Sequence, residues 1–247
     1  MNILGIIPAR FASTRFPGKP LVKLGDKTII EHVYTKSSVA LKWVYVATDD
    51  QRISDEVKRF GGRAVMTTYN HRSGTDRCAE ALDIIEKETD KKFDVVINIQ
   101  GDEPFIQPDQ ISQLSGLFGD PTSQISTLVK KTINPEEIFD PNKPKVVLDN
   151  NGFALIFSRS PVPYLRGLPK EDWPGEFVFY KHIGIYGYRS SVLREITKLS
   201  PSYPEIAESL EQLRWLSHGF KIKTALTDHE SIGIDTPEDL AKAMKMI

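Results

Sequence analysis

The sequence predicts an α/β fold, a mostly parallel, twisted, Rossmann-like sheet with helices on both faces and an antiparallel insertion. Strand and helix patterns alternate along the chain up to about residue 120. Residues 93–99 form a near-continuous apolar run, as expected for a central parallel strand that is covered on both faces. Farther along, D-N-N-G separates two strand-like runs, which is typical of a β-hairpin.

Hydrophobic spacing, together with turn and capping residues, predicts the individual elements in order. In the alternating part, strands are expected at 3–7, 43–48, 64–66 and 93–99, and helices at 28–39, 51–60, 75–87 and 108–118. In the remainder, strands are expected at 145–148, 153–158, 183–188 and 221–227, and helices at 205–218 and 237–246. We predict a single domain spanning residues 1–247, in which residues 125–190 form the antiparallel insertion and cover a substrate or a partner subunit.

Composition argues against several classes of protein. Lys and Arg number 32 and Asp and Glu 33, so no global positive field favours nucleic acid. Cys78 is the single cysteine, which excludes an internal disulfide framework. No apolar run reaches the roughly 20 residues needed to span a bilayer, and no secretory signal pattern opens the chain. We therefore expect a soluble, cytoplasmic protein that binds neither nucleic acid nor membrane.

The loop after the first strand is the most informative feature of the chain. It reads P-A-R-F-A-S-T-R-F-P-G-K-P and carries three cations, Arg10, Arg15 and Lys19. Ligands of open α/β sheets bind at the carboxyl ends of the strands. Small residues allow backbone N–H groups to approach phosphate, and spaced cations neutralise its charge. The loop therefore predicts a triphosphate-binding site, although a surface turn with three solvated cations is the simpler alternative.

Two acidic residues stand at the ends of apolar runs. Asp102 lies in Q-G-D-E-P, directly after a strand of buried type, and is a hard oxygen ligand suited to Mg²⁺ or else a turn or capping residue. Its neighbour Glu103 is equally consistent with a turn. Asp235 lies in G-I-D-T-P-E-D, where spacing alone favours Asp235 or Thr236 as a helix N-cap over a metal ligand.

Other polar positions leave both a structural and a functional reading open. The segment R-S-G-T-D-R, from Arg72 to Arg77, either caps a helix or contacts a base or sugar. His182 is a packed histidine or part of a ligand-facing strand, and Arg159 is a carboxylate clamp or a surface cation. Spacing places Glu208, Glu211 and Gln212 on one helix face, which by itself indicates a solvated acidic surface. No nucleophile–base pair is evident, which argues against covalent catalysis.

Taken together, ordered blocks of sequence resemble the 3-deoxy-manno-octulosonate (Kdo) cytidylyltransferase family. The blocks include P-A-R-F-A-S-T-R-F-P-G-K-P, S-G-T-D-R, N-I-Q-G-D-E-P, H-I-G-I-Y-G-Y, L-E-Q-L-R and G-I-D-T-P-E-D-L, and they span residues 3–240. The resemblance implies a nucleotidyltransferase fold, a homodimer with the insertion at its interface, and Mg²⁺ as cofactor. It also implies a reaction in which CTP and Kdo give CMP-Kdo and pyrophosphate for the inner core of lipopolysaccharide.

The resemblance also implies roles for individual residues. Asp102 and Asp235 become the Mg²⁺ ligands, which replaces the capping interpretation of Asp235. The remaining residues are implied to contact substrate, with Arg10, Lys19 and Arg15 at the triphosphate, Ser73 and Gly74 at the cytosine with Gln100 beside them, and Arg77, Arg159, His182, Tyr186, Glu211 and Gln212 at the sugar. Asp76 stands where Glu is common in the family, which keeps the charge.

Two alternatives to this function stay open at the level of sequence. One is the same chemistry on another acid sugar, such as 8-amino-Kdo or sialic acid. The other is a non-catalytic nucleotide-binding subunit, which the presence of both Asp102 and Asp235 disfavours.

Overall fold

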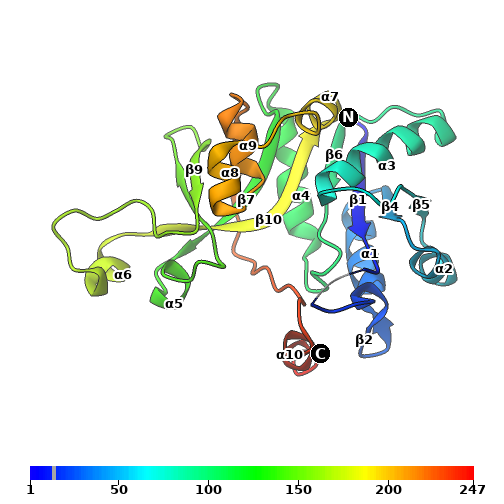
Figure 1. Cartoon of the computed structure of the whole chain (residues 1–247), viewed down its shortest axis with the longest axis horizontal. Coiled ribbons are helices and arrows are strands. Elements are labelled where there is room, and N and C mark those ends of the chain that lie inside the picture. Colours follow the sequence, from blue (N-terminus) through cyan, green and yellow to red (C-terminus); the bar gives the residue numbers. More distant parts are fainter. Residues whose placement is uncertain (13–14) are drawn as a thin grey trace.

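The fold is a twisted mixed sheet with helices on both faces, and it confirms the predicted α/β class (Figure 1). The coordinates are a computed structural model, which describes residues 1–12 and 15–247. The main sheet has the strand order β11-β7-β10-β6-β1-β4-β5. The bounds of these strands are β1 Ile3–Ala9, β4 Trp43–Thr48, β5 Ala64–Met66, β6 Val95–Asn98, β7 Ile125–Thr132, β10 Phe179–Arg189 and β11 Ile222–Leu226.

Parallel pairing dominates this sheet. β1 pairs in parallel with both β4 and β6, β4 with β5, and β7 with β11. β10 runs antiparallel to both of its neighbours, β6 and β7. The carboxyl ends of the parallel strands therefore lie at one edge of the sheet, toward the side where the C-terminal helix lies in Figure 1.

Side chains alternate between two hydrophobic cores because strand residues point to opposite faces. On β1, Leu4 and Ile6 enter one core while Ile7 and Ala9 enter the other. The first core contains residues from α3 (Gly74–Thr89), α7 (Ser190–Ile196) and α9 (Gln212–Ser217), and the second contains residues from α1 (Ile29–Ala40), α2 (Gln51–Arg59) and α4 (Pro108–Gly116). The sheet is thus covered on both faces, as its apolar central strands require.

The insertion region contributes to the main sheet as well as extending beyond it. β7 and β10 belong to the main sheet, and β8 (Lys145–Leu148) and β9 (Ala154–Ser158) continue from the first half of β10. The short helices α5 (Pro135–Ile138) and α6 (Trp173–Glu176) complete a lobe that protrudes from one side in Figure 1. The predicted hairpin is confirmed, since Gly152 adopts a φ of 75° in the turn between β8 and β9.

β7 is a strand that the sequence patterns above do not predict. Its polar residues Ser126 and Thr127 are fully buried, so it lacks the apolar run of a central strand. The Thr127 hydroxyl donates to the Ile185 carbonyl at 2.8 Å, where β10 shifts its register. This hydroxyl supplies a hydrogen bond to a carbonyl of a strand more than 50 positions away. The sequence of β7 by itself does not reveal such a partner.

The predicted helix at 205–218 is wrong as one continuous element. The structure divides it into α8 (Tyr203–Glu208) and α9, because Ser209 adopts the left-handed conformation with a φ of 51°. Glu208 therefore does not share a helix face with Glu211 and Gln212. The other predicted elements agree with the structure to within a few residues, including the closing helix α10 (Pro237–Ala243), whereas α5, α6 and α7 were not predicted.

No helix in the described part of the chain is both long enough and apolar enough to span a membrane.

Gly187 offers a test of the packing between the sheet and the turn after α4, Leu117–Gly119. A Cβ built there would lie 2.6 Å from Phe118 Cε2 and 2.9 Å from Ile97 Cδ1, so the side chains must shift. We expect Gly187→Ala to lower the free energy of unfolding by about 1–3 kcal/mol, measured by urea denaturation. Gly119→Ala is the control, because its Cβ meets nothing within 4 Å, and it should change stability by no more than about 0.5 kcal/mol. Equal effects from both variants would contradict this account of the packing.

Candidate active site

A cavity of about 280 Å³ lies at the carboxyl ends of β1 and β6. Its walls come from the loop after β1, from the start of α3, from the Q-G-D segment after β6 and from the segment before α10. Nine predicted site residues line it, namely Arg10, Arg15, Lys19, Ser73, Gly74, Arg77, Gln100, Asp102 and Asp235. The cavity therefore lies at the predicted place, the strand ends where open α/β sheets bind ligands.

The Lys19 side chain joins the two acids at the centre of this cavity. Its ammonium group donates to Asp102 Oδ2 at 2.7 Å and to Asp235 Oδ1 at 2.9 Å. The side chain of Lys19 is only 12% exposed, so these ion pairs are partly shielded from water. Two carboxylates that are 133 positions apart (235 minus 102) thus converge on one cation.

Arg15 adds a second positive charge on the solvent side. Its guanidinium lies 3.0 Å from Asp235 Oδ2. Burial raises the pKa of the Asp235 carboxyl, but the hydrogen bond and charge of Lys19, together with Arg15, outweigh it and leave the pKa below its usual value. Asp235 is therefore an anion at neutral pH.

Thr236, and not Asp235, caps the closing helix. The Thr236 hydroxyl accepts from the Asp239 backbone N–H at 3.2 Å, and the Asp239 carboxylate returns to the N-cap, forming a capping box. In G-I-D-T, Thr236 is therefore the helix cap, and Asp235 is the candidate metal ligand. Asp235 is left with its carboxylate directed into the cavity.

Backbone geometry fixes the loop after β1 and the Q-G-D segment. Gly18 has a φ of 72° and its N–H donates to the Phe11 carbonyl at 2.9 Å, which turns the chain toward Lys19. A Cβ at Gly101 would lie 2.9 Å from the Pro8 carbonyl oxygen, so this close approach of two backbones needs glycine. Ser13 and Thr14 of the same loop lie outside the described residues.

The start of α3 forms the opposite wall. Ser73 is the N-cap, and its hydroxyl accepts from the Asp76 N–H at 3.1 Å. Arg77 lines the cavity but is almost fully buried, donating to Thr67 Oγ1 at 2.6 Å and lying 3.4 Å from Asp49 Oδ1. The capping and functional readings of R-S-G-T-D-R are thus compatible.

The other five predicted residues do not line this cavity but form a neighbouring group, namely Arg159, His182, Tyr186, Glu211 and Gln212. Two hydrogen bonds connect the group to the cavity wall. Thr75 of α3 donates to Glu211 Oε2 at 2.7 Å, and the Gln100 amide donates to the Gly184 carbonyl of β10 at 3.1 Å.

Within this group, burial sets the ionisation of the side chains. Desolvation lowers the pKa of His182 to about 3, so the ring is neutral, and its Nε2 lies 3.1 Å from Thr127 Oγ1. The same effect raises the pKa of Tyr186 well above its usual value and raises that of Glu211, against hydrogen bonds from Thr75 and Ser73. His182 and Tyr186 therefore offer neutral hydrogen-bonding partners rather than fixed charges.

Arg159 is occupied by backbone carbonyls. Its guanidinium donates to the carbonyls of Glu208 at 2.6 Å, Pro141 at 2.8 Å and Ser209 at 3.3 Å. These bonds hold the end of α8 against the lobe, so contact with a sugar carboxylate stays a prediction for Arg159.

One residue that lines the cavity was not singled out from the sequence, and another beside it was given no role beyond a turn. His71 lines the cavity and pairs with Glu80 Oε2 at 2.5 Å, and its place just before the α3 cap is the signal that could have found it. Glu103 is not merely a turn residue. Its carboxylate is buried and accepts from Ser231 Oγ at 2.6 Å, while desolvation and, secondarily, the charge of Asp102 raise its pKa to about 7 despite that hydrogen bond.

The donor set of the two acids fits a divalent cation. Asp102 and Asp235 supply hard oxygen ligands, and the Lys19 ammonium already lies within hydrogen-bonding distance of both. Across residues 1–12 and 15–247 no group of three or more His, Cys, Asp or Glu is arranged to hold a metal ion. Mg²⁺ commonly binds through one or two carboxylates plus substrate phosphates, which is the arrangement that this pair allows.

Comparison with known proteins identifies the family of this chain. A family model described as cytidylyltransferase matches residues 4–223. A 3-deoxy-manno-octulosonate cytidylyltransferase from Bacteroides thetaiotaomicron is 55% identical, over 100% of this chain and 98% of that protein. This chain belongs to the 3-deoxy-manno-octulosonate cytidylyltransferase family. The equivalent protein from Parabacteroides distasonis is 53% identical, with the same coverage.

Solved structures support the same family and fold. A CMP-2-keto-3-deoxy-manno-octonic acid synthetase complexed with CTP is 39% identical, with a TM-score of 0.88 over 100% of this chain and 98% of that one. A putative glucose-1-phosphate thymidylyltransferase from Bacillus anthracis is 18% identical, with a TM-score of 0.66 over 99% of this chain and 94% of that one, and shares the fold.

The buried, neutral His182 gives a pH-dependence that can be measured. Its folded pKa of about 3 lies below the usual 6.5, so the unfolded chain takes up the proton first and stability falls as pH drops below 6.5. Between pH 7 and pH 5 this group should cost about 2 kcal/mol of unfolding free energy. His182→Gln should lose that component, so urea titrations of the variant should show a correspondingly shallower decline. A decline as steep as that of the wild type would contradict a neutral His182.

Proposed function

We propose that this protein transfers the cytidylyl group of CTP to Kdo, forming CMP-Kdo and releasing pyrophosphate. The observation that carries the proposal is the convergence of Lys19, Asp102 and Asp235 in a cavity at the strand ends. Its support comes from relatives that are 53–55% identical and named for this activity, and from a structural neighbour complexed with CTP. The product would supply activated Kdo for the inner core of lipopolysaccharide, and we place the reaction in the cytoplasm.

The reaction asks the protein mainly for positioning and charge stabilisation. The anomeric hydroxyl of Kdo attacks the α-phosphorus of CTP in line, and pyrophosphate leaves. Arg10, Arg15 and Lys19 would bind the triphosphate and hold the leaving pyrophosphate. Ser73 and Gly74 would bound the base, since both line the cavity at the start of α3.

The acid pair would hold the metal cofactor. When bound by Asp102 and Asp235, Mg²⁺ would neutralise charge on the α-phosphate and favour loss of the sugar hydroxyl proton. No separate catalytic base is required on this view. Beyond Gln100, the sugar would then be bounded by Glu211, Gln212, His182 and Tyr186.

A homodimer completes the proposal. Large apolar side chains are exposed along the lobe, including Leu155 at 61%, Ile156 at 43% and Val178 at 43%. Several large apolar side chains exposed on one lobe favour a subunit interface there, and a second copy would cover them by two-fold symmetry.

Pyrophosphate release from CTP tests the function and separates it from its alternatives. We expect release with Kdo, and competition assays with 8-amino-Kdo and with sialic acid to favour Kdo. Faster turnover of 8-amino-Kdo or sialic acid would assign the same chemistry to another sugar. CTP binding without release, with any of the three sugars, would indicate a non-catalytic nucleotide-binding subunit.

Asp102→Asn tests the metal site. The amide keeps the size of the side chain but removes the charge that a divalent cation needs, so kcat at saturating CTP, Kdo and Mg²⁺ should fall about 100-fold or more, on the order of 3 kcal/mol of barrier. Asp109→Asn is a matched control, since Asp109 is exposed in the first turn of α4 and outside the cavity, and should leave kcat within about twofold. A kcat of Asp102→Asn close to that of the wild type would remove Asp102 from the catalytic site.

A further inference from the structure

The segment that delivers Asp235 to the cavity has no regular secondary structure. It spans residues 227–234, between the end of β11 and the start of α10. Near its end, the Ile234 N–H donates to the Asp102 carbonyl at 2.9 Å, and Ser231 donates to Glu103. Those contacts attach it to the Q-G-D segment itself. An irregular segment needs further anchors if it is to place a ligand reproducibly.

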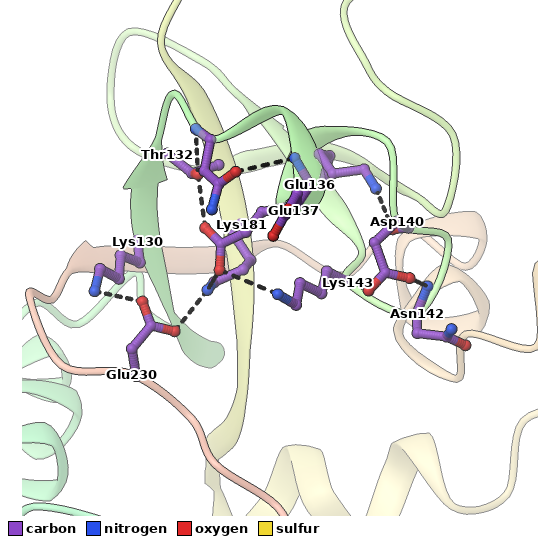
Figure 2. A network of polar contacts seen from close by, with 11 residues as sticks. Lys130, Thr132, Glu136, Glu137, Asp140, Asn142, Lys143, Lys181 and Glu230 are labelled. Carbon is purple, nitrogen blue, oxygen red and sulfur yellow. Dashed lines mark hydrogen bonds and ion pairs between the residues drawn. The ribbon is translucent and has the colours of Figure 1, made fainter. Parts of the chain in front are cut away.

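Glu230, in the middle of the segment and directly before Ser231, provides such an anchor, as Figure 2 shows. One of its carboxylate oxygens lies 2.5 Å from Lys130 Nζ, and the other accepts from Lys181 Nζ at 2.6 Å. Lys130 lies on β7 and Lys181 on β10, so this one carboxylate joins the segment to two strands of the main sheet.

The two lysines give the position its specificity for an anion. Lys130 and Lys181 are directly opposite each other in the antiparallel register of β7 and β10, where like charges destabilise a sheet. Lys181 is only 6% exposed, and it also pairs with Glu137 of α5. Glu230 is therefore the group that neutralises this cross-strand pair on the side of the segment.

The same polar network reaches into the lobe. Glu137 accepts from Thr132 Oγ1 at 2.7 Å and lies 3.3 Å from Lys143 Nζ (Figure 2). Lys143 thus belongs to the network without touching residues 227–234 through any ion pair of the described chain. This difference between Glu230 and Lys143 separates an effect on the segment from a general loss of lobe charge.

We propose that Glu230 is a positioning residue for Asp235. By fixing the segment to β7 and β10 five residues before Asp235, it sets the point from which the chain crosses to the Q-G-D segment and brings the two acids together. The consequence for metal binding rests on the proposed function. The consequence for the placement of the segment does not.

The first experiment measures the segment without substrate or metal. Hydrogen exchange at the Ile234 amide, which donates to the Asp102 carbonyl, should speed up about tenfold in Glu230→Ala and stay at the wild-type rate in Lys143→Ala. Lys130→Ala removes one of the two cations that hold Glu230 and should give a smaller increase. An unchanged exchange rate in Glu230→Ala would overturn the proposal.

The second experiment measures the acid pair directly. Mn²⁺ binding in the presence of CTP, followed by the electron paramagnetic resonance of free Mn²⁺, should weaken about tenfold in Glu230→Ala, because residues that orient a metal ligand typically matter at this level. Lys143→Ala should bind like the wild type. Faster exchange with unchanged Mn²⁺ affinity would overturn the link between Glu230 and the acid pair. Wild-type Mn²⁺ affinity in Asp102→Asn would instead count against the proposed metal site.

Discussion

The placement of one ammonium group between two carboxylates is the constraint on which the site depends. Lys19 contacts Asp102 and Asp235, which lie 83 and 216 positions away along the chain. Two carboxylates so close together repel unless a cation lies between them. The loop after β1, the end of β6 and the segment before α10 must therefore meet at one point, and the parallel arrangement of β1 and β6 brings the first two to the same edge of the sheet.

Local signals were enough to predict the fold class and the cavity. The strand patterns, the turn at Gly18 and the residues that end β1 and β6 all act within a few positions of the chain, and nine predicted site residues line one cavity. The features that were missed depend on distant partners. In β7, the Thr127 hydroxyl donates to the β10 backbone where β10 shifts its register. The break at Ser209 follows from a left-handed backbone conformation that serine rarely adopts. Likewise, two of the three carbonyl partners of Arg159, those of Glu208 and Ser209, are some 50 positions away, so its sequence position alone does not predict them.

The cavity and the neighbouring group around His182 and Tyr186, the two halves of the predicted site, differ in their electrostatics. Around Lys19 the groups are charged and partly open to solvent, with Asp235 43% and Arg15 66% exposed. Around His182 and Tyr186 the protein removes water, and desolvation favours the neutral forms of both side chains. Such a division suits a charged phosphate chain at one end and a hydroxyl-rich group at the other. The Thr75–Glu211 and Gln100–Gly184 hydrogen bonds join the halves through α3 and β10, so that neither half is positioned independently.

Charge balance connects the protein alone with the proposed substrate complex. Asp102 and Asp235 contribute two negative charges, and Lys19 and Arg15 contribute two positive charges, so the cluster is neutral as it stands. A divalent cation on the two acids would by itself neutralise them and release both basic side chains to face the triphosphate. When a divalent cation replaces Lys19 and Arg15 as the partner of the two acids, the distance between the acids has to stay the same. A hydrogen-bonded backbone holds that distance better than a flexible side chain does. Anchoring of residues 227–234 at Glu230, Ser231 and Ile234 supplies that rigidity on the Asp235 side, and the close approach of Gly101 to Pro8 supplies it on the Asp102 side.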